Sequence, residues 1–178
     1  VLHWSNDPLG QMIQCQRALR PDGLFLGVMM GGKTLLELRG AFAQAETKIL
    51  DGLSPRVLPM SDIRDIGSLL QRAGFAMPVV DSMLLPVTYE TPLNLMLDLR
   101  DMGEANAQTE RCKNFTRRGL IEETIKVYCE NYSTSGKRIY ATFEQLWLAG
   151  WAPSGSQRKP LKPGSAKMRL ADVLKVTK

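Results

Sequence analysis

An apolar run that follows a turn constrains this chain more than any other feature. Residues 24–30 (LFLGVMM) come after Pro21-Asp22-Gly23 and are apolar at consecutive rather than alternate positions. Such a run is typical of a strand that helices cover on both faces, as in a parallel sheet. Before the turn, residues 8–19 have helical spacing with Asp7 as N-cap, and residues 1–4 have the composition of a strand end. Strand, helix, turn and buried strand predict a βαβ unit and an α/β fold.

Two more helices are predicted after this unit. Apolar residues at helical spacing indicate helices over residues 35–49 and 63–73. Thr34 and Glu37 have the spacing of a capping box at the start of the first helix. Ser61 can cap the second helix.

The second half of the chain predicts two strands with helices between them. Residues 78–89 form the first strand, in which Pro86 indicates an edge position or a bulge. One helix begins at Thr91 and ends near residue 103, and another covers residues 121–132. Residues 139–151 are rich in β-branched and aromatic side chains, which predicts a long final strand.

The charge of the chain is concentrated at one end. The net charge is +5, and residues 156–178 hold seven Lys and Arg residues against one acidic residue. Because no aromatic residues are interleaved with these charges, a solvated tail is favoured over a nucleic-acid site. We therefore expect a domain over residues 1–155 and a basic Pro-, Gly- and Lys-rich tail over residues 156–178.

Two classes of site or segment are disfavoured by composition. No apolar run approaches the roughly 20 residues that a membrane-spanning helix needs. His3 is the only histidine, so a zinc site or a two-histidine iron site cannot be assembled from this chain alone.

Residues 27–34 (GVMMGGKT) match the pattern of a phosphate-binding loop and lie between a predicted strand and a predicted helix. Such a loop needs flexible backbone whose N–H groups can wrap a phosphate. Residues 28–30 are instead bulky, apolar and continuous with the strand. A glycine turn that joins a strand to a helix is the better interpretation, and a nucleotide triphosphatase is a remote alternative.

Seven stretches, spread in order over nearly the whole chain, carry a resemblance to a known family. They are LHWSNDP, LRPDGLFLG, GGKTLLELR, SPRVLPMSDIRDIGSLLQRAGF, DLRDMGEAN, YATFEQLWLAGWAPS and SQRKPLKPGSA. The chain resembles the class I S-adenosylmethionine-dependent methyltransferases, and among them the methyltransferase-like assembly factors of respiratory complex I. It is similar, less closely, to the malonyl-carrier-protein methyltransferase of biotin synthesis.

The resemblance implies the C-terminal half of a Rossmann-like sheet, with strands in the order 4-5-7-6, an antiparallel last strand and added helices. In this family the glycine-rich cofactor loop and the acid for the ribose hydroxyls belong to the N-terminal half, which we expect this chain to lack. The implied cofactor is S-adenosylmethionine, with its main site outside the chain. We accordingly expect the chain alone to bind this cofactor poorly.

Several candidate site residues follow the carboxyl ends of the first two predicted strands, where open α/β sheets bind ligands. They are His3, Trp4, Asn6, Asp7, Gly31, Gly32 and Thr34. The resemblance places Leu2, His3 and Trp4 nearest the cofactor and leaves the others for the substrate. Trp4 is a candidate apolar wall or a core aromatic, and His3 is a candidate general base or a structural histidine.

Four more candidates belong to two helices. Arg39 lies beside the same crevice and is a candidate ligand for a carboxylate or a phosphate, with an exposed ion pair as the alternative. The resemblance places Met102, Glu104 and Asn106 in a lid over the substrate. Helix capping alone also explains Asn106.

The resemblance implies a fragment of a protein that acts on a protein substrate, a respiratory complex I subunit, by methyl transfer or arginine hydroxylation. The alternatives are a carboxyl O-methyltransferase acting on a carrier-bound acyl chain, and a non-catalytic assembly factor. The fold alone does not decide among them. The implied location is the bacterial cytoplasm or the mitochondrial matrix.

Overall fold

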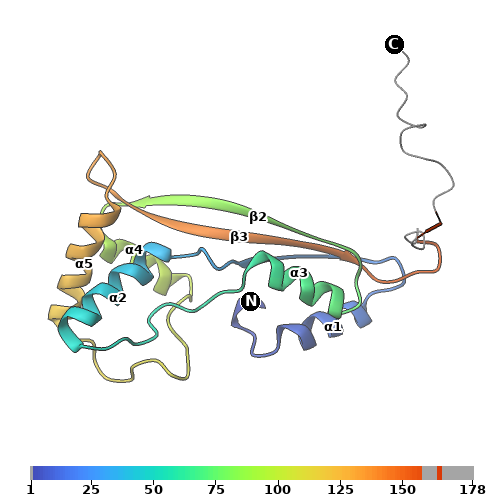
Figure 1. Cartoon of the computed structure of the whole chain (residues 1–178), viewed down its shortest axis with the longest axis horizontal. Coiled ribbons are helices and arrows are strands. Elements are labelled where there is room, and N and C mark those ends of the chain that lie inside the picture. Colours follow the sequence, from blue (N-terminus) through green and yellow to red (C-terminus); the bar gives the residue numbers. More distant parts are fainter. Residues whose placement is uncertain (1, 158–163, 166–178) are drawn as a thin grey trace, which may run out of the picture.

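The computed structural model describes residues 2–157, 164 and 165. Its elements are a 3₁₀ helix η1 (Leu2–Trp4), helices α1 (Pro8–Ala18), α2 (Leu36–Leu50), α3 (Ile63–Arg72), α4 (Pro92–Asp101) and α5 (Arg118–Tyr132), and strands β1 (Leu24–Met30), β2 (Ala76–Tyr89) and β3 (Ile139–Trp151). Figure 1 shows the long strands β2 and β3 spanning two groups of helices. The tail predicted over residues 156–178 lies mostly outside the described residues.

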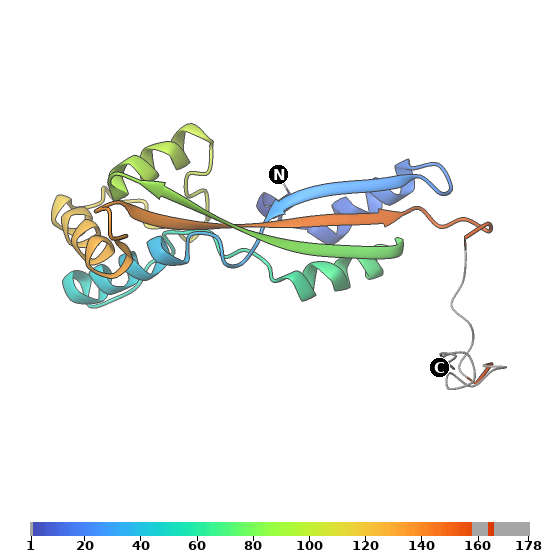
Figure 2. The ribbon, with the colours of Figure 1, turned by 90° about the horizontal axis from the view of Figure 1, so that it is seen from above.

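The three strands form one sheet in the order β1-β3-β2, and both pairs are antiparallel. The last strand therefore lies between the other two, as the implied order 5-7-6 with an antiparallel last strand requires. Figure 2 shows β3 between its two neighbours. β2 is an edge strand that accommodates Pro86, which confirms the edge position predicted from that proline.

The strand predicted at residues 1–4 is wrong for the part that the structure describes. Leu2–Trp4 forms a 3₁₀ turn, in which the Ser5 N–H donates to the Leu2 carbonyl at 3.1 Å. These residues are apolar, as in a strand, but their backbone groups form hydrogen bonds within a local turn instead of pairing with β1.

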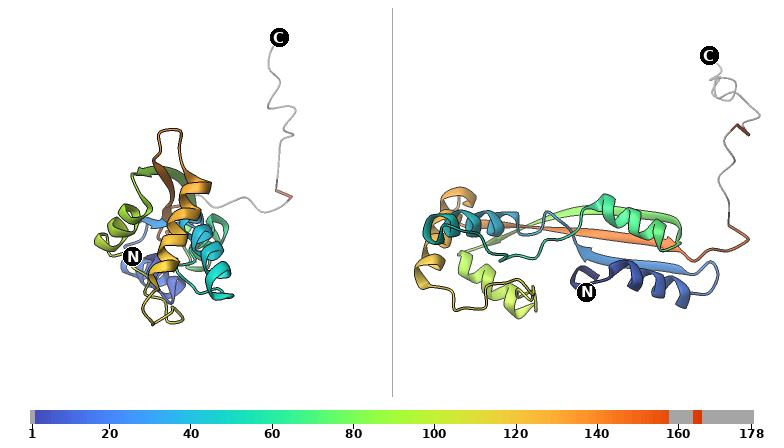
Figure 3. Two further views of the ribbon diagram at one scale, coloured as in Figure 1. Left: turned by 90° about the vertical axis from the view of Figure 1, so that its left-hand side faces the viewer. Right: turned by 60° about the horizontal axis from the view of Figure 1, so that its bottom comes forward.

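Two hydrophobic cores lie on opposite faces of the sheet. The first core joins α1 and α3 to Leu146 and Leu148 of β3. The second joins α2, α4 and α5 to Ile139, Ala141 and Phe143. Successive side chains of a strand point to opposite faces, so the odd and even positions of β3 serve different cores. Figure 3, in its left panel, shows α5 between α2 and α4 at one end.

This arrangement corrects the prediction that residues 24–30 are buried on both faces. Met29 is buried, but Leu24, Leu26 and Val28 are exposed, Leu26 to 71%. Met29 belongs to the core that α1 and α3 form on one face of the sheet, and the second core lies at the far end of the sheet. A run of consecutive apolar residues indicates that a strand is partly buried. It does not indicate which face of the strand is packed against helices.

The helix starts confirm the predicted cap at Asp7, show a further cap at Thr91 and overturn two predicted caps. Asp7 and Thr91 accept hydrogen bonds from Gly10 N–H and Asn94 N–H, as N-caps do. Asp62, not Ser61, caps α3. The predicted capping box before α2 does not form, because Leu35 is the N-cap residue and makes no side-chain cap bond. No helix among the described residues is long and apolar enough to cross a membrane.

Candidate substrate site

A crevice lies beyond the carboxyl end of β1. Four segments meet there: η1, the turn over residues 31–35, the connection 55–61 before α3, and the connection 104–110 after α4. This is the position at which open α/β sheets bind ligands. The chain brings together segments that are about a hundred residues apart in sequence, as the bonds below show.

The turn after β1 is held by one buried carboxylate. Glu144, 5% exposed, accepts from Lys33 N–H at 2.8 Å and from Ser82 Oγ at 2.7 Å. Gly31 N–H donates to the Glu144 carbonyl, and Thr34 N–H donates to the Gly31 carbonyl. A Cβ atom on Gly31 would lie 2.6 Å from the Glu144 carboxylate, so glycine is needed for this close approach.

These bonds argue against a phosphate loop. The N–H groups that would wrap a phosphate are already bonded to protein oxygens, and a carboxylate lies beside them. A carboxylate at that position repels a phosphate. The structure thus supports the glycine-turn interpretation of residues 27–34 over the triphosphatase alternative.

We predict that Lys33→Ala changes neither nucleotide affinity nor stability by more than about 0.5 kcal/mol, because the side chain is exposed and only its backbone N–H is used. Calorimetry with ATP–Mg²⁺ and thermal unfolding of both proteins measure this. Saturable ATP–Mg²⁺ binding that the substitution abolishes would restore the phosphate-loop interpretation.

Glu104 is placed by the C-terminus of α4. Gly103 has φ +79°, and its N–H donates to Arg100, while Glu104 N–H donates to the Leu99 carbonyl at 2.8 Å. This pair of bonds is the Schellman motif, which needs a left-handed residue that glycine adopts freely. The motif ends the helix and turns the Glu104 side chain toward η1.

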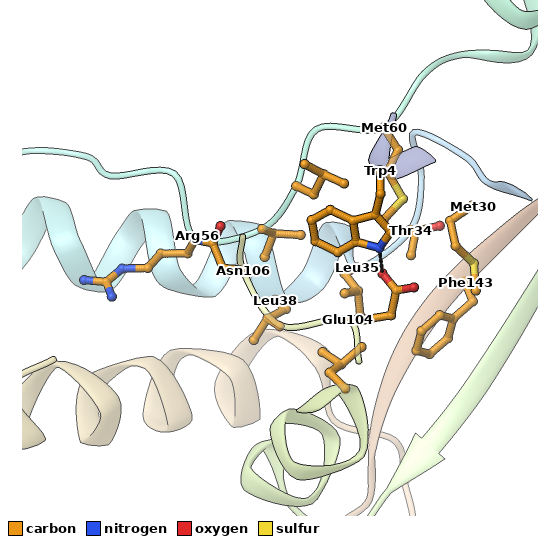
Figure 4. Close-up of a pocket in the computed structure, with 13 residues that line it drawn as sticks. Trp4, Met30, Thr34, Leu35, Leu38, Arg56, Met60, Glu104, Asn106 and Phe143 are labelled. Atoms are coloured by element: carbon orange, nitrogen blue, oxygen red, sulfur yellow. Dashed lines mark hydrogen bonds between the residues drawn. The ribbon is translucent and has the colours of Figure 1, made fainter. Parts of the chain in front are cut away.

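Glu104 joins two side chains of η1. Its carboxylate accepts from Trp4 Nε1 at 3.0 Å and lies 3.1 Å from His3 Nε2. The side chains of His3 and Glu104 are 6% and 22% exposed. Figure 4 shows the indole N–H of Trp4 directed at the carboxylate. The three side chains tie the start of the chain to the segment after α4.

Trp4 and Glu104 border an apolar pocket that is partly open to solvent and has a cavity volume of about 50 Å³. We call it the Trp4 pocket. Its wall is mostly aliphatic, aromatic or thioether and includes Met30, Leu35, Leu38, Val57, Leu58, Met60, Leu99 and Phe143. Ligand pockets commonly combine such walls with a few polar groups that orient the ligand.

One of the two charged residues in the wall is already neutralised. Arg56 Nε donates to Glu46 Oε1 at 2.6 Å, and Arg56 Nη1 donates to Thr116 Oγ1 at 2.9 Å. Glu46 is 1% exposed and also accepts from Ser54. Burial raises the pKa of Glu46, but hydrogen bonds from Ser54 and Arg56 outweigh it and bring the pKa below 4.5. Glu46 is therefore ionised at neutral pH and compensates Arg56.

A second, more polar groove adjoins the Trp4 pocket and shares Trp4, Leu58 and Met60 with it. His3 and Gln108 also line this groove. His3 Nδ1 and Gln108 Nε2 are buried, and neither has a hydrogen-bond partner among the described residues. Buried polar atoms of this kind need an explanation, and a ligand or ordered water is the usual one.

The structure brings together seven of the predicted site residues. Trp4, Thr34, Glu104 and Asn106 border the Trp4 pocket, and Leu2, His3, Trp4 and Asn6 border the groove. Asn106 also donates to the Pro55 carbonyl at 2.7 Å, so it joins two segments of the wall. It does not cap α4. Whether these residues bind a ligand stays a prediction.

Five other predicted residues lie outside these cavities. Asp7 caps α1, Gly31 and Gly32 form the turn, and Met102 is 55% exposed at the end of α4. Arg39 makes no ion pair with any residue that the structure describes. It donates through Nη2 to the Leu58 carbonyl at 3.2 Å and thereby supports the wall.

Sequence reasoning missed Leu38, Met60, Phe143 and Gln108, as well as the pair Glu46–Arg56. Leu38 and Phe143 had an ordinary core pattern. Met60 and Arg56 lie in a connection without periodicity, where no local signal indicates contact with η1.

Comparison with known proteins gives relatives that match almost the whole chain. The mitochondrial arginine hydroxylase NDUFAF5 of Danio rerio is 40% identical over 99% of this chain, and that of Dictyostelium discoideum is 38% identical over 97%. A malonyl-[acyl-carrier protein] O-methyltransferase of Methylovorus is 33% identical over 90% of the chain. The chain is similar in sequence to both groups. The predicted resemblance is thus confirmed.

The matches cover only part of these relatives. The chain spans 55% of the Danio protein, 39% of the Dictyostelium protein and 51% of the Methylovorus protein, about half of their length. No protein-family model matches the chain.

Two solved structures are similar in part. They are a protein from Bacillus halodurans assigned as a methyltransferase and the YcgJ protein of Bacillus subtilis, with TM-scores of 0.49 and 0.48. They are 15% and 13% identical to the chain, each over 86% of its length, and the match takes in 67% and 61% of their own chains. Both scores lie below 0.5. The fold is therefore defined by the strand order and register of this chain and not by these two structures.

Proposed function

We propose that the chain is part of a methyltransferase-like enzyme of the complex I assembly-factor type that modifies an arginine of a protein partner. The observation that carries the proposal is identity with arginine hydroxylases of animals and Dictyostelium over 97–99% of the chain. Identity with the malonyl-carrier-protein methyltransferases is lower and covers less of the chain.

For methyl transfer the implied cofactor is S-adenosylmethionine, which would supply an activated methyl group, whereas hydroxylation would need a separate oxidant. The residues of the groove fit one wall of such a site. Trp4 offers an aromatic surface, and His3 Nδ1 offers a ring nitrogen that has no hydrogen-bond partner among the described residues. His3 Nε2 is engaged by Glu104, so a role of His3 in proton transfer would use Nδ1.

The second candidate is methylation of a carrier-bound carboxyl group, which the malonyl-carrier-protein relatives support. The charge of the Trp4 pocket disfavours it. Arg56 is paired with Glu46 and is not free to bind a carboxylate, and the Glu104 carboxylate repels one. A cationic substrate suits the same site.

Deletion of the gene in the source organism, followed by mass spectrometry of respiratory complex I subunits, tests the proposal. We expect one arginine to lose a mass of one oxygen atom, for hydroxylation, or of one methylene, for methylation. The full-length gene should restore it. Unchanged arginines together with a requirement for biotin would reject the proposal in favour of the carrier-bound substrate.

The location follows from the same relatives. The arginine hydroxylases are mitochondrial proteins. We propose the mitochondrial matrix for a eukaryotic source and the cytoplasm for a bacterial one.

A further inference from the structure

We infer that the Trp4 pocket holds the guanidinium group of the substrate arginine, with Glu104 as its carboxylate partner. The inference rests on the proposed function and goes further, because it assigns the substrate side chain to a particular cavity and to a particular charge. Neither the strand order nor the relatives specify this placement.

The charge of the pocket favours a cation. Two of the residues in its wall carry a formal charge, Arg56 and Glu104. The guanidinium of Arg56 is compensated by Glu46 at 2.6 Å. The partners of Glu104 are the neutral indole N–H of Trp4 at 3.0 Å and His3 Nε2 at 3.1 Å, which forms an ion pair with the carboxylate only if the imidazole is protonated. A carboxylate that is 22% exposed beside an apolar wall favours a cation in the pocket.

Glu104 keeps free hydrogen-bonding capacity that a guanidinium group can use. An ionised carboxylate has about four acceptor sites on its two oxygens. Trp4 Nε1 and His3 Nε2 occupy part of this capacity. A guanidinium group presents several N–H donors in one plane. It can therefore donate to the acceptor sites of the Glu104 carboxylate that Trp4 and His3 leave free.

The apolar surface around the carboxylate suits the side chain of arginine. The indole of Trp4 borders the same cavity, and cations stack favourably on indole faces. Leu38, Leu99 and Phe143 line the deeper wall. Arginine combines a weakly hydrated planar cation with three methylene groups, which an apolar wall can cover. The ammonium of lysine is more strongly hydrated and matches this environment less well.

The adjoining groove suits a peptide backbone. It shares Trp4, Leu58 and Met60 with the pocket and contains Gln108 Nε2, which has no hydrogen-bond partner among the described residues. A peptide carbonyl can accept a hydrogen bond from this amide nitrogen. A protein segment could therefore lie along the groove while its arginine enters the pocket.

Calorimetry with short peptides tests the inference without any reaction. The probes are glycyl-arginyl-glycine amide and the same peptide with citrulline, which has nearly the same shape but no charge. We expect the chain to bind the arginine peptide at least about tenfold more tightly than the citrulline peptide. Glu104→Gln should bring this ratio close to one. Asp101→Asn, an acid-to-amide change at a 75% exposed side chain nearby, should leave it unchanged.

Three outcomes would overturn the inference. They are equal binding of the two peptides by the unchanged protein, a preference that survives Glu104→Gln, and tighter binding of a lysine or S-methylmethionine peptide than of the arginine peptide. The last outcome would assign the pocket to another cation. Thermal unfolding of each variant shows that loss of preference does not reflect loss of the fold.

The peptide test and the deletion experiment fail separately. Arginine-selective binding without a changed arginine in complex I would keep the pocket assignment and reject the proposed function. The opposite result is that an arginine of complex I is changed, and that Glu104→Gln in the full-length protein does not affect this change. It would keep the proposed function and reject the pocket assignment.

Discussion

Glu46→Ala should lower the free energy of unfolding by about 3–5 kcal/mol, because it leaves Arg56 as a buried charge without its partner. Glu46 is 1% exposed, and the Arg56 side chain is 15% exposed. The same carboxylate also accepts from the backbone N–H and the hydroxyl group of Ser54. Urea unfolding followed by circular dichroism measures the change.

An exposed ion pair provides the control. Glu122 pairs with Arg118 at 2.8 Å on the surface of α5, with side chains 61% and 92% exposed. Glu122→Ala should leave the unfolding midpoint almost unchanged, since exposed pairs contribute little. Equal effects of the two substitutions would mean that the Glu46 pair does not hold the segment of residues 54–57 against α2.

The effect of Glu46 should depend on pH. Its pKa in the folded protein lies below 4.5, so its contribution to stability is present above that unfolded value and is lost as the pH falls through the folded value. The difference between the unchanged protein and Glu46→Ala should therefore narrow in acid, below about pH 4.5. A difference that stays constant down to pH 2 would show that the carboxylate charge contributes nothing.

The chain should self-associate through an exposed apolar strip on the sheet. The strip consists of Leu24, Leu26, Val28, Val79 and Trp147, and register places Val28 opposite Trp147 and Val79 opposite Ala149. β1 pairs only with β3 within the described residues, so its other edge has unpaired N–H and C=O groups. An apolar face beside an unpaired strand is a template for association.

Light scattering should show oligomers for the unchanged chain and a shift toward monomer for Leu26→Lys. Leu53→Lys is the matched control, because Leu53 is 72% exposed, as Leu26 is to 71%, but lies in a loop away from the strip. A monodisperse monomer of the unchanged chain would contradict the prediction. So would an equal response to both substitutions.

The order and type of the elements were largely predictable, but their partners were not. β-branched and aromatic residues identified β3, and the helical stripes identified α2 and α3. The predicted capping box failed because Glu37 bonds instead to the backbone N–H and hydroxyl of Thr142, 105 residues away. A local pattern cannot reveal a competitor at that distance, and tertiary bonds often replace local ones.

The same limit applies to the site. The position of Trp4 after a strand-like segment and the resemblance of residues 98–106 pointed to the crevice. The bond between Trp4 and Glu104 required the Schellman turn at Gly103 and the 3₁₀ turn of η1 together. The contributions of Met60 and Arg56 depend on where a connection without periodicity crosses the crevice.

Photo-crosslinking with an arginine peptide tests most directly whether this crevice receives the substrate. The probe is the glycyl-arginyl-glycine peptide with a photoreactive group next to arginine, and mass spectrometry maps the adducts. We predict adducts on residues 57–61 and 104–110 that excess unlabelled arginine peptide removes and the citrulline peptide does not. Adducts confined to the exposed strip of β1 and β3, or unaffected by either competitor, would contradict the placement of the substrate in this crevice.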